Sequence, residues 1–154
     1  RWFCFHSFDL SSRSNGASGL GRVLQRGTLV YQIGRDGQRT AVDTNPSKFL
    51  GLNKPMVVLV NKNSASGSEI IAAGLRANGV ATVFGTQTAG GVGTGQPREL
   101  PDGGLLLVTL TKMQDAKTGA DLNGPGKGVV PDRVIGDPAD QQLQAAIEYL
   151  RSRV

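Results

Sequence analysis

The sequence predicts an α/β fold, and three neighbouring features carry that prediction. The apolar run Met56–Val60 is rich in β-branched residues, which is typical of a strand buried on both faces. Apolar and small residues then recur at helical spacing as far as Asn78, and Gly79 is a natural helix stop. A second apolar run, Val80–Phe84, follows directly. An apolar content of 38% and 22 glycines suit an α/β protein with many tight loops.

Further elements are expected on both sides of this unit. Four short strands should form two pairs, each closing over a turn: Leu29–Ile33 with Arg39–Val42, and Glu99–Leu100 with Leu105–Leu110. A last helix is expected from Asp137-Pro138, because proline is favoured in a first helical turn. Its apolar stripe consists of Leu143, Ala146, Ile147, Leu150 and Val154.

The first 24 residues give weaker signals. Phe3, Phe5, Phe8 and Leu10 suggest a strand, and Leu20, Val23 and Leu24 suggest a short helix. His6 is the only histidine, and alternate residues of a strand point to opposite faces, so His6 and Ser7 would diverge. A packing or surface role is therefore expected for His6.

Composition excludes several classes of protein. The net charge is +5, but the basic residues are scattered, which favours an ordinary surface and not a nucleic-acid site. A single cysteine, Cys4, permits no intrachain disulfide. No apolar stretch approaches the roughly 20 residues of a spanning helix. Neither glycine-rich segment, Gly90–Gly95 or Gly124–Gly128, ends in the Gly-Lys-Ser/Thr of a phosphate-binding loop, so no nucleotide site is expected.

A serine cluster, Ser64–Ser68, stands where the first strand gives way to the helix. A serine projecting from a helix N-terminus lies beside free backbone amides that favour developing negative charge. Serines before a helix, with Glu69 in the first turn, also suit plain helix capping. The local pattern alone leaves both interpretations open.

The segment Ser64-Ala65-Ser66-Gly67-Ser68-Glu69 resembles the Ser-Ala-Ser-Ala-Ser-Glu motif of the C-terminal processing, or tail-specific, serine peptidases. The resemblance implies that Ser66 is the nucleophile. It extends over most of the chain from about residue 29 to residue 150, and Gly128–Asp132 matches the Gly-Ile-x-Pro-Asp signature of the family closely.

The general-base lysine of the family is missing. The family has Thr-Phe-Gly-Lys-Gly-Thr-Val-Gln, whereas this chain has Thr-Ala-Gly-Gly-Val-Gly-Thr-Gly-Gln at residues 88–96. One alignment puts Val92 at the lysine position and the other puts Gly91 there. Gln96 corresponds to the glutamine that orients the base. Lys62 and Lys112 are the candidates for a substitute base.

The resemblance also implies a fold, an oxyanion hole and a domain organisation. The fold is the ββα-superhelix core shared with the Clp protease and crotonase families, as a single truncated domain over residues 1–154 without the peptide-binding PDZ module. The oxyanion hole is expected from the backbone amides of Gly67 and Gly16, although the glycine pair of the family is absent around Gly16. The segment before Leu20 should therefore be least faithful to the family.

Three functions follow from the resemblance. The first is a serine peptidase that cleaves protein substrates near their C-termini through an acyl-enzyme at Ser66. The second is a non-catalytic homologue that binds peptides or serves as a structural part, and the third is a crotonase-like acyl-thioester enzyme. No metal and no cofactor are expected. The partners would be substrate C-termini, with homo-oligomers allowed, and the family suggests a periplasmic, secreted or thylakoid-lumen location.

Overall fold

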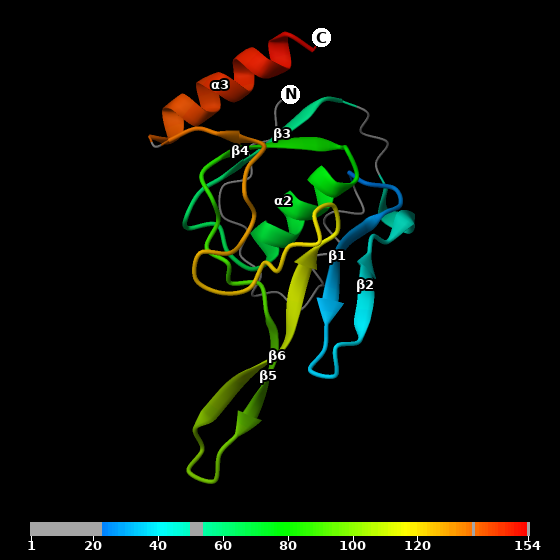
Figure 1. Ribbon diagram of the computed structural model, residues 1–154, viewed down its shortest axis with the longest axis vertical. Coiled ribbons are helices and arrows are strands. Elements are labelled where there is room, and N and C mark those ends of the chain that lie inside the picture. The colour runs from blue at the N-terminus through cyan, green and yellow to red at the C-terminus, as the bar shows by residue number, and fades with distance from the viewer. Residues whose placement is uncertain (1–22, 50–53, 137, 154) are drawn as a thin grey trace.

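The computed structural model describes residues 23–49, 54–136 and 138–153, and its elements form two sheets with a helix between them (Figure 1). One sheet has the order β2-β1-β6-β5 and the other has the order β3-β4-β7. The α/β prediction is confirmed. The elements are β1 (Thr28–Ile33), β2 (Arg39–Asp43), the 3-10 turn η1 (Pro46–Lys48), β3 (Met56–Val60), α2 (Gly67–Ala77), β4 (Ala81–Gly85), β5 (Thr94–Glu99), β6 (Leu105–Asp115), β7 (Arg133–Val134) and α3 (Ala139–Arg151).

The four-stranded sheet is antiparallel. β1 pairs with β2 across the predicted turn, where Gly37 adopts a positive φ of 78° that glycine tolerates without strain. β1 also pairs with the last residues of β6, from Lys112 to Asp115. The sequence predicted β1 and β2 within one residue at each end. The short helix expected around Leu20–Leu24 is not formed at Val23 and Leu24, and its earlier residues lie outside the described ranges.

The three-stranded sheet is parallel, and its centre is β4. The expectation that Met56–Val60 would be the most buried strand is wrong among the described strands. β3 pairs with β4 alone, whereas β4 has β3 on one side and β7 on the other, so Val83 and Phe84 are fully buried. Within β3, Val58 is buried and Leu59 only partly so.

Helix α2 fills the space between the two sheets (Figure 1). Leu75 on the helix packs in one apolar core with Leu29 of the antiparallel sheet and Val83 of the parallel sheet. A buried ion pair joins Arg76 of α2 to Asp115 at the end of β6, and Arg76 also donates to the Val130 carbonyl. These contacts hold the C-terminal end of α2 in a fixed relation to both sheets.

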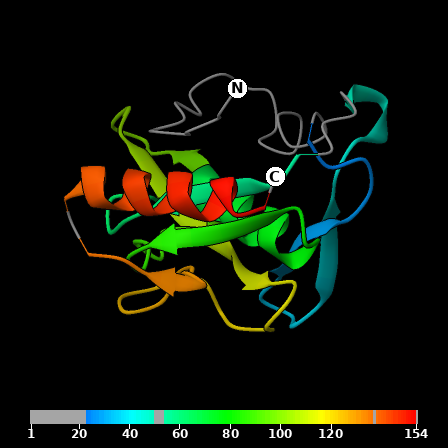
Figure 2. The ribbon, with the colours of Figure 1, turned by 90° about the horizontal axis from the view of Figure 1, so that it is seen from above.

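Helix α3 covers the other side of the parallel sheet, where it runs along β3 and β4 (Figures 1 and 2). Phe84 meets Tyr149 edge to face with ring centroids 5.2 Å apart, and Ala146 and Leu150 complete this second core. The predicted apolar stripe is right for Ala146 and Leu150. It is wrong for Leu143, which is 44% exposed and is not part of this core. Val154 lies outside the described residues.

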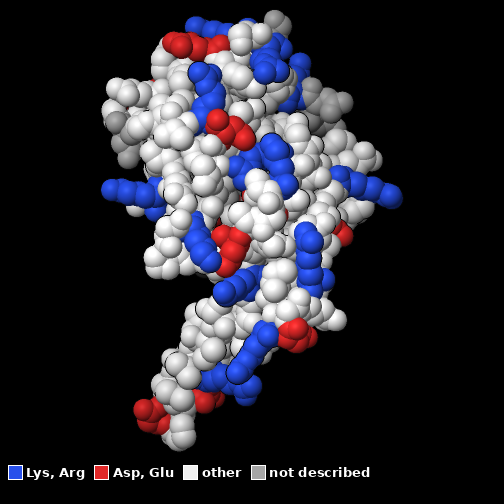
Figure 3. Space-filling view, in the orientation of Figure 1, with Lys and Arg blue, Asp and Glu red and all other residues white. Residues whose placement is uncertain are grey.

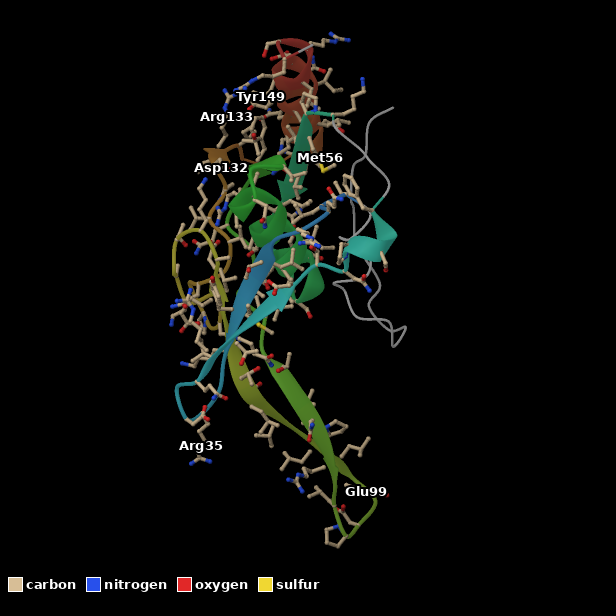
Figure 4. The ribbon with its side chains drawn as sticks, turned by 90° about the vertical axis from the view of Figure 1, so that its right-hand side faces the viewer. Arg35, Met56, Glu99, Asp132, Arg133 and Tyr149 are labelled. Carbon is tan, nitrogen blue, oxygen red and sulfur yellow. The ribbon has the colours of Figure 1, made fainter. Side chains whose placement is uncertain are left out.

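Strands β5 and β6 form a long hairpin whose outer part projects from the body as an arm (Figures 1 and 4). We define the arm as residues 94–111. Its tip is the predicted turn at residues 101–104, but both strands are longer than expected. β5 begins at Thr94, inside the segment expected to be a glycine loop, and β6 runs on to Asp115 because β1 supplies a second pairing partner there.

Candidate active site

Ser66 stands at the sharp turn between β3 and α2. It is the N-cap of α2, and Asn78 is the C-cap, so the predicted position of the serine and the predicted helix end are both confirmed. Its backbone has φ 57° and ψ −120°, and no other non-glycine residue in the described ranges has a positive φ. Such a conformation costs of the order of 1–3 kcal/mol and is typical of functional turns. A strained strand-to-helix turn is also how many hydrolases present a nucleophilic serine.

The Ser66 side chain is exposed and makes no cap hydrogen bond. The capping is done by Glu69 instead, whose Oε2 accepts from the Ser66 amide at 3.0 Å. Ser64 stabilises the preceding turn, because its hydroxyl oxygen accepts a hydrogen bond from the Asn61 amide at 3.1 Å. The capping interpretation therefore accounts for Glu69 and Ser64 but leaves the hydroxyl of Ser66 to face solvent.

Gly67 is the first residue of α2 and is buried. Amide groups in the first turn have no partner within the helix, and the helix dipole adds positive potential there. The Gly67 amide thus has the chemical character that an oxyanion donor needs. Gly16, the other predicted donor, lies outside the described residues, as do His6 and the predicted strand at residues 3–10.

Glu69 ties the serine turn to the glycine loop. Its carboxylate is fully buried and accepts four hydrogen bonds. Oε1 accepts from the Thr88 hydroxyl and from the Gly90 amide at 2.8 Å, and Oε2 accepts from the Ser66 amide and from the Gly91 amide at 2.9 Å. Four donors use the roughly four lone-pair sites of a carboxylate. The positions of residues 66 and 91 are thereby coupled through one side chain.

Thr88 extends the same network to the Gly128–Asp132 segment. Its hydroxyl oxygen accepts from the Val129 amide at 2.7 Å while its hydrogen goes to Glu69. Gly128 packs so closely that an added Cβ would lie 2.9 Å from Glu69 Oε1. Sequence reasoning missed Thr88. The only available signal was that it opens the stretch similar to the lysine motif of the family.

The structure distinguishes between the two alignments, which put either Val92 or Gly91 at the lysine position of the family motif. The Val92 side chain is 2% exposed and belongs to the main apolar core, so this position points away from the surface turn. Gly91 is exposed, and among the described residues a Cβ built on it would meet one atom within 4 Å, the Cβ of Ala65 at 3.8 Å. Residue 65 directly precedes Ser66. The geometry therefore supports the alignment that puts Gly91, and not Val92, at the lysine position.

Gln96 is not held in the network around Glu69. It lies on β5 within the arm, where it is exposed and opposite Val108. In the family motif the glutamine follows the lysine by four residues, which corresponds to Gly95 once Gly91 takes the lysine position. A shift of one residue along a strand turns a side chain to the opposite face. This extra residue is why the structure does not place Gln96 as the motif predicts.

Lys112 and Lys62, the two candidates for a substitute base, do not take part in the hydrogen-bond network around Glu69. Lys112 Nζ lies 3.8 Å from Asp121 Oδ2, and Lys127 Nζ lies 2.6 Å from the same oxygen. Partial burial raises the pKa of Asp121, but the Lys127 hydrogen bond, the Asn123 amide and both lysine charges outweigh it, so the net pKa is lowered. Lys62 is exposed on the turn before Ser66.

No cluster of three or more histidine, cysteine, aspartate or glutamate residues in the described ranges could hold a metal ion. Among the same residues, no helix has the length and apolar character needed to cross a membrane.

Comparison with known proteins gives the family. Residues 13–135 match the model of Peptidase family S41. The chain belongs to this family. A carboxyl-terminal-processing protease of Synechocystis is 34% identical over 141 residues, which are 85% of this chain and 32% of that protein. The chloroplastic carboxyl-terminal-processing peptidase 2 of Arabidopsis thaliana is 38% identical over 112 residues, which are 73% of this chain and 21% of that protein.

Solved structures of S41 relatives and similar proteins support the fold. The photosystem II D1 C-terminal processing protease superposes with a TM-score of 0.70 at 27% identity, over 88% of this chain and 34% of that chain. A lipoprotein from Streptococcus agalactiae gives 0.71 at 21% identity, over 88% of this chain and 48% of that chain, a likeness of fold alone. The S41 chain described here thus spans about a third of the length of the first curated relative.

Proposed function

We propose that this S41 domain presents Ser66 as a peptidase nucleophile but lacks the general base, so that it engages protein or peptide chains and hydrolyses them slowly or not at all. The observation that carries the proposal is the exposed glycine at position 91. A Cβ built on it would lie beside Ala65, the residue before Ser66. An active S41 peptidase would have a lysine there.

The nucleophile half of the site supports the proposal. Ser66 keeps a strained backbone and an exposed hydroxyl, and the Gly67 amide beside it can stabilise an oxyanion. In an acyl transfer, Ser66 Oγ would attack the peptide carbonyl carbon, its proton would pass to a base, and the amine would leave with that proton. Every part of this step except the base has a candidate in the described residues.

The missing base decides the rate. A serine hydroxyl is neutral at pH 7 and attacks an amide slowly until a neighbour removes its proton. Positioned general-base catalysis contributes about 10²- to 10⁴-fold, and glycine cannot supply it. The relatives named as carboxyl-terminal-processing enzymes support protein C-termini as the chains that this domain engages. A homo-oligomer and the finer preference for C-termini are parts of the same proposal.

The experiment restores the base. Turnover of an unfolded protein such as casein is measured for the parent chain, for Ser66→Ala, for Gly91→Lys, and for Gly91→Lys combined with Ser66→Ala. Gly91 has no positive φ, so a lysine fits there without backbone strain. We expect Gly91→Lys to raise turnover about a hundredfold or more at about pH 10, where a large fraction of the lysine is neutral, and the added Ser66→Ala to abolish the gain.

The pH profile gives an independent readout. Because Gly91 is exposed, a lysine there would keep a pKa near the ordinary value of about 10.4, and its neutral form would grow as the pH rises from 7 to 10. The Gly91→Lys gain should grow over the same interval. Val92→Lys is the matched control, since it puts the same charge one residue away in the core, and no gain is expected from it.

Robust turnover by the parent chain, lost in Ser66→Ala, would refute the inactive interpretation and require another base, with Lys112 the first to test. The runner-up function, a crotonase-like acyl-thioester enzyme, predicts instead that an acyl-thioester binds the parent chain and is turned over without Ser66.

A further inference from the structure

The arm exposes apolar side chains on both of its faces. Leu105 and Leu107 are 73% and 71% exposed on one face, and Leu106 and Val108 are exposed on the other, where β5 contributes Gln96 and Arg98. Apolar surface that is contiguous and exposed marks an interaction site or an aggregation liability. The arm projects away from both cores, so the described part of the chain does not cover these residues (Figure 4).

One backbone edge of the arm is also unpaired. β6 pairs with β5 along the arm, but on its opposite edge β1 reaches only Lys112–Asp115. Across Leu105–Leu110 that edge has no partner strand within the described residues. Natural edge strands are protected by charges, proline or bulges. The sequence Leu-Leu-Leu-Val-Thr-Leu of this stretch contains no charge and no proline.

The ends of the arm differ in charge. Glu99 and Asp102 lie at its tip, with Arg98 as the one nearby cation. Lys112, which is 66% exposed, lies at the base of the arm, and Arg35 lies in the β1–β2 turn, two residues after the Ile33 that pairs with Lys112. Figure 3 shows acidic side chains at the far end of the arm and basic ones near its origin, and Figure 4 labels Glu99 near the tip of the arm and Arg35 at the end of the β1–β2 hairpin.

We propose that the arm is a dimerisation element, in which the β6 edge of one copy pairs antiparallel with the β6 edge of a second copy. An antiparallel pairing about a two-fold axis is self-complementary, since the same patch supplies both sides. With the axis at Leu107, Leu105 of one copy lies opposite Thr109 of the other. In the same register Asp102, in the turn beyond the paired strands, comes to the end of the free edge, where Ile33 of β1 pairs with Lys112, so the acidic tip of each arm meets the basic base of its partner.

The resulting sheet has the order β5-β6-β6-β5. It pairs the free β6 edge of each copy, leaves β5 at the two outer edges, and brings the apolar faces of the two arms side by side. A second copy fits this edge better than an acidic or a basic peptide, because the charge alternates from tip to base in the way that an antiparallel copy matches. The element is separate from Ser66, and its failure would leave the peptidase proposal standing.

The first experiment measures self-association of the whole chain by sedimentation velocity over a concentration series reaching about 100 μM. We expect a reversible dimer. Leu107→Lys sets two like charges opposite each other on the axis and should weaken the dimer by roughly tenfold or more. Leu143→Lys is the matched control, because it changes a similarly exposed leucine on α3, and it should leave the association unchanged.

The second experiment tests the register. Single cysteines at positions 105 to 109, in a Cys4→Ser background, are oxidised and scored for disulfide-linked dimers. The yield should peak at position 107, where each residue faces its own counterpart. Asp102→Lys should weaken the dimer about fivefold, in line with the modest strength of exposed ion pairs counted twice. Adding Lys112→Glu should restore it.

A monomer at 100 μM would overturn the proposal. So would a dimer that Leu107→Lys leaves intact, because the interface would then lie elsewhere. A cysteine yield that peaks at another position, or charge reversals that fail to compensate, would refute the proposed register.

Discussion

Replacing Glu69 with glutamine tests whether one carboxylate holds the serine turn and the glycine loop together. The substitution keeps the volume of the side chain but converts one acceptor oxygen into a donor. If the new NH₂ replaces Oε2, it faces the amides of Ser66 and Gly91, and both bonds are lost. If it replaces Oε1, the Thr88 oxygen can accept from it, and only the Gly90 amide is left facing a donor. The second orientation is the less costly one.

The magnitude follows from this count. One buried amide without an acceptor costs about 1–3 kcal/mol. The three bonds that persist lose their charge assistance, which roughly halves their strength. We therefore expect Glu69→Gln to lower the free energy of unfolding by about 2–5 kcal/mol, a large share of the 5–15 kcal/mol typical of a domain. The melting temperature should fall by roughly 4–20 °C, at about 2–4 °C per kcal/mol for a domain of this size.

Urea unfolding followed by far-ultraviolet circular dichroism measures the difference. Glu148→Gln is the matched control, since Glu148 is exposed on α3 and accepts a single hydrogen bond, from Gln144 at 3.1 Å. Its effect should stay within about 0.5 kcal/mol. If the two variants unfold at the same urea concentration, the four-bond network does not stabilise the fold and the coupling between residues 66 and 91 is wrong.

Two further predictions concern strain and charge. Ser66→Gly should be more stable than Ser66→Ala by about 1 kcal/mol in the same urea assay. The reason is that glycine adopts φ 57° without the steric cost that alanine retains. Equal stabilities of the two variants would mean that the turn stores no strain. The Asp121 carboxyl should titrate below 3.8 by carbon-detected NMR, and Lys127→Met should raise that midpoint. Because the pKa of Asp121 is lower in the folded state, its carboxylate stabilises the fold above pH 3.8. The stability lost in Asp121→Asn should therefore shrink as the pH falls through the pKa of the folded state. A stability loss that does not change with pH would contradict this.

The sequence predicted the parts of the fold that depend on local periodicity. The run Met56–Val60, the helix to Asn78 and the strand after it all follow from apolar spacing, and the structure confirms them within one residue. The relative burial of β3 and β4 could not be predicted in this way, because it depends on which strand lies in the middle of the sheet. The length of β6 was missed for a similar reason, since the polar residues near Asp115 are ordered by pairing with a strand 80 residues earlier.

The site was predictable in its residue types but not in its geometry. Glycine loops have no periodicity, so the sequence alone could not choose between Gly91 and Val92 for the lysine position. The choice came from packing, because Val92 fills the core and Gly91 faces the surface. The positive φ of Ser66 was equally invisible, since a serine before a helix usually caps it with an ordinary extended backbone.

This arrangement separates the folding role of the motif from its chemistry. Glu69, Thr88 and the amides of residues 90 and 91 form one hydrogen-bond network, so losing these bonds would cost stability whether or not the site is active. A lysine at position 91 would add nothing to that network, because its side chain would leave from an exposed backbone position where, among the described residues, a Cβ meets Ala65 alone within 4 Å. The base can therefore be lost without loss of the fold, and the serine turn can persist after its chemistry has ended. For this reason a match to the serine motif establishes the family, while the proposed loss of activity concerns position 91, whose side chain would take no part in the buried network.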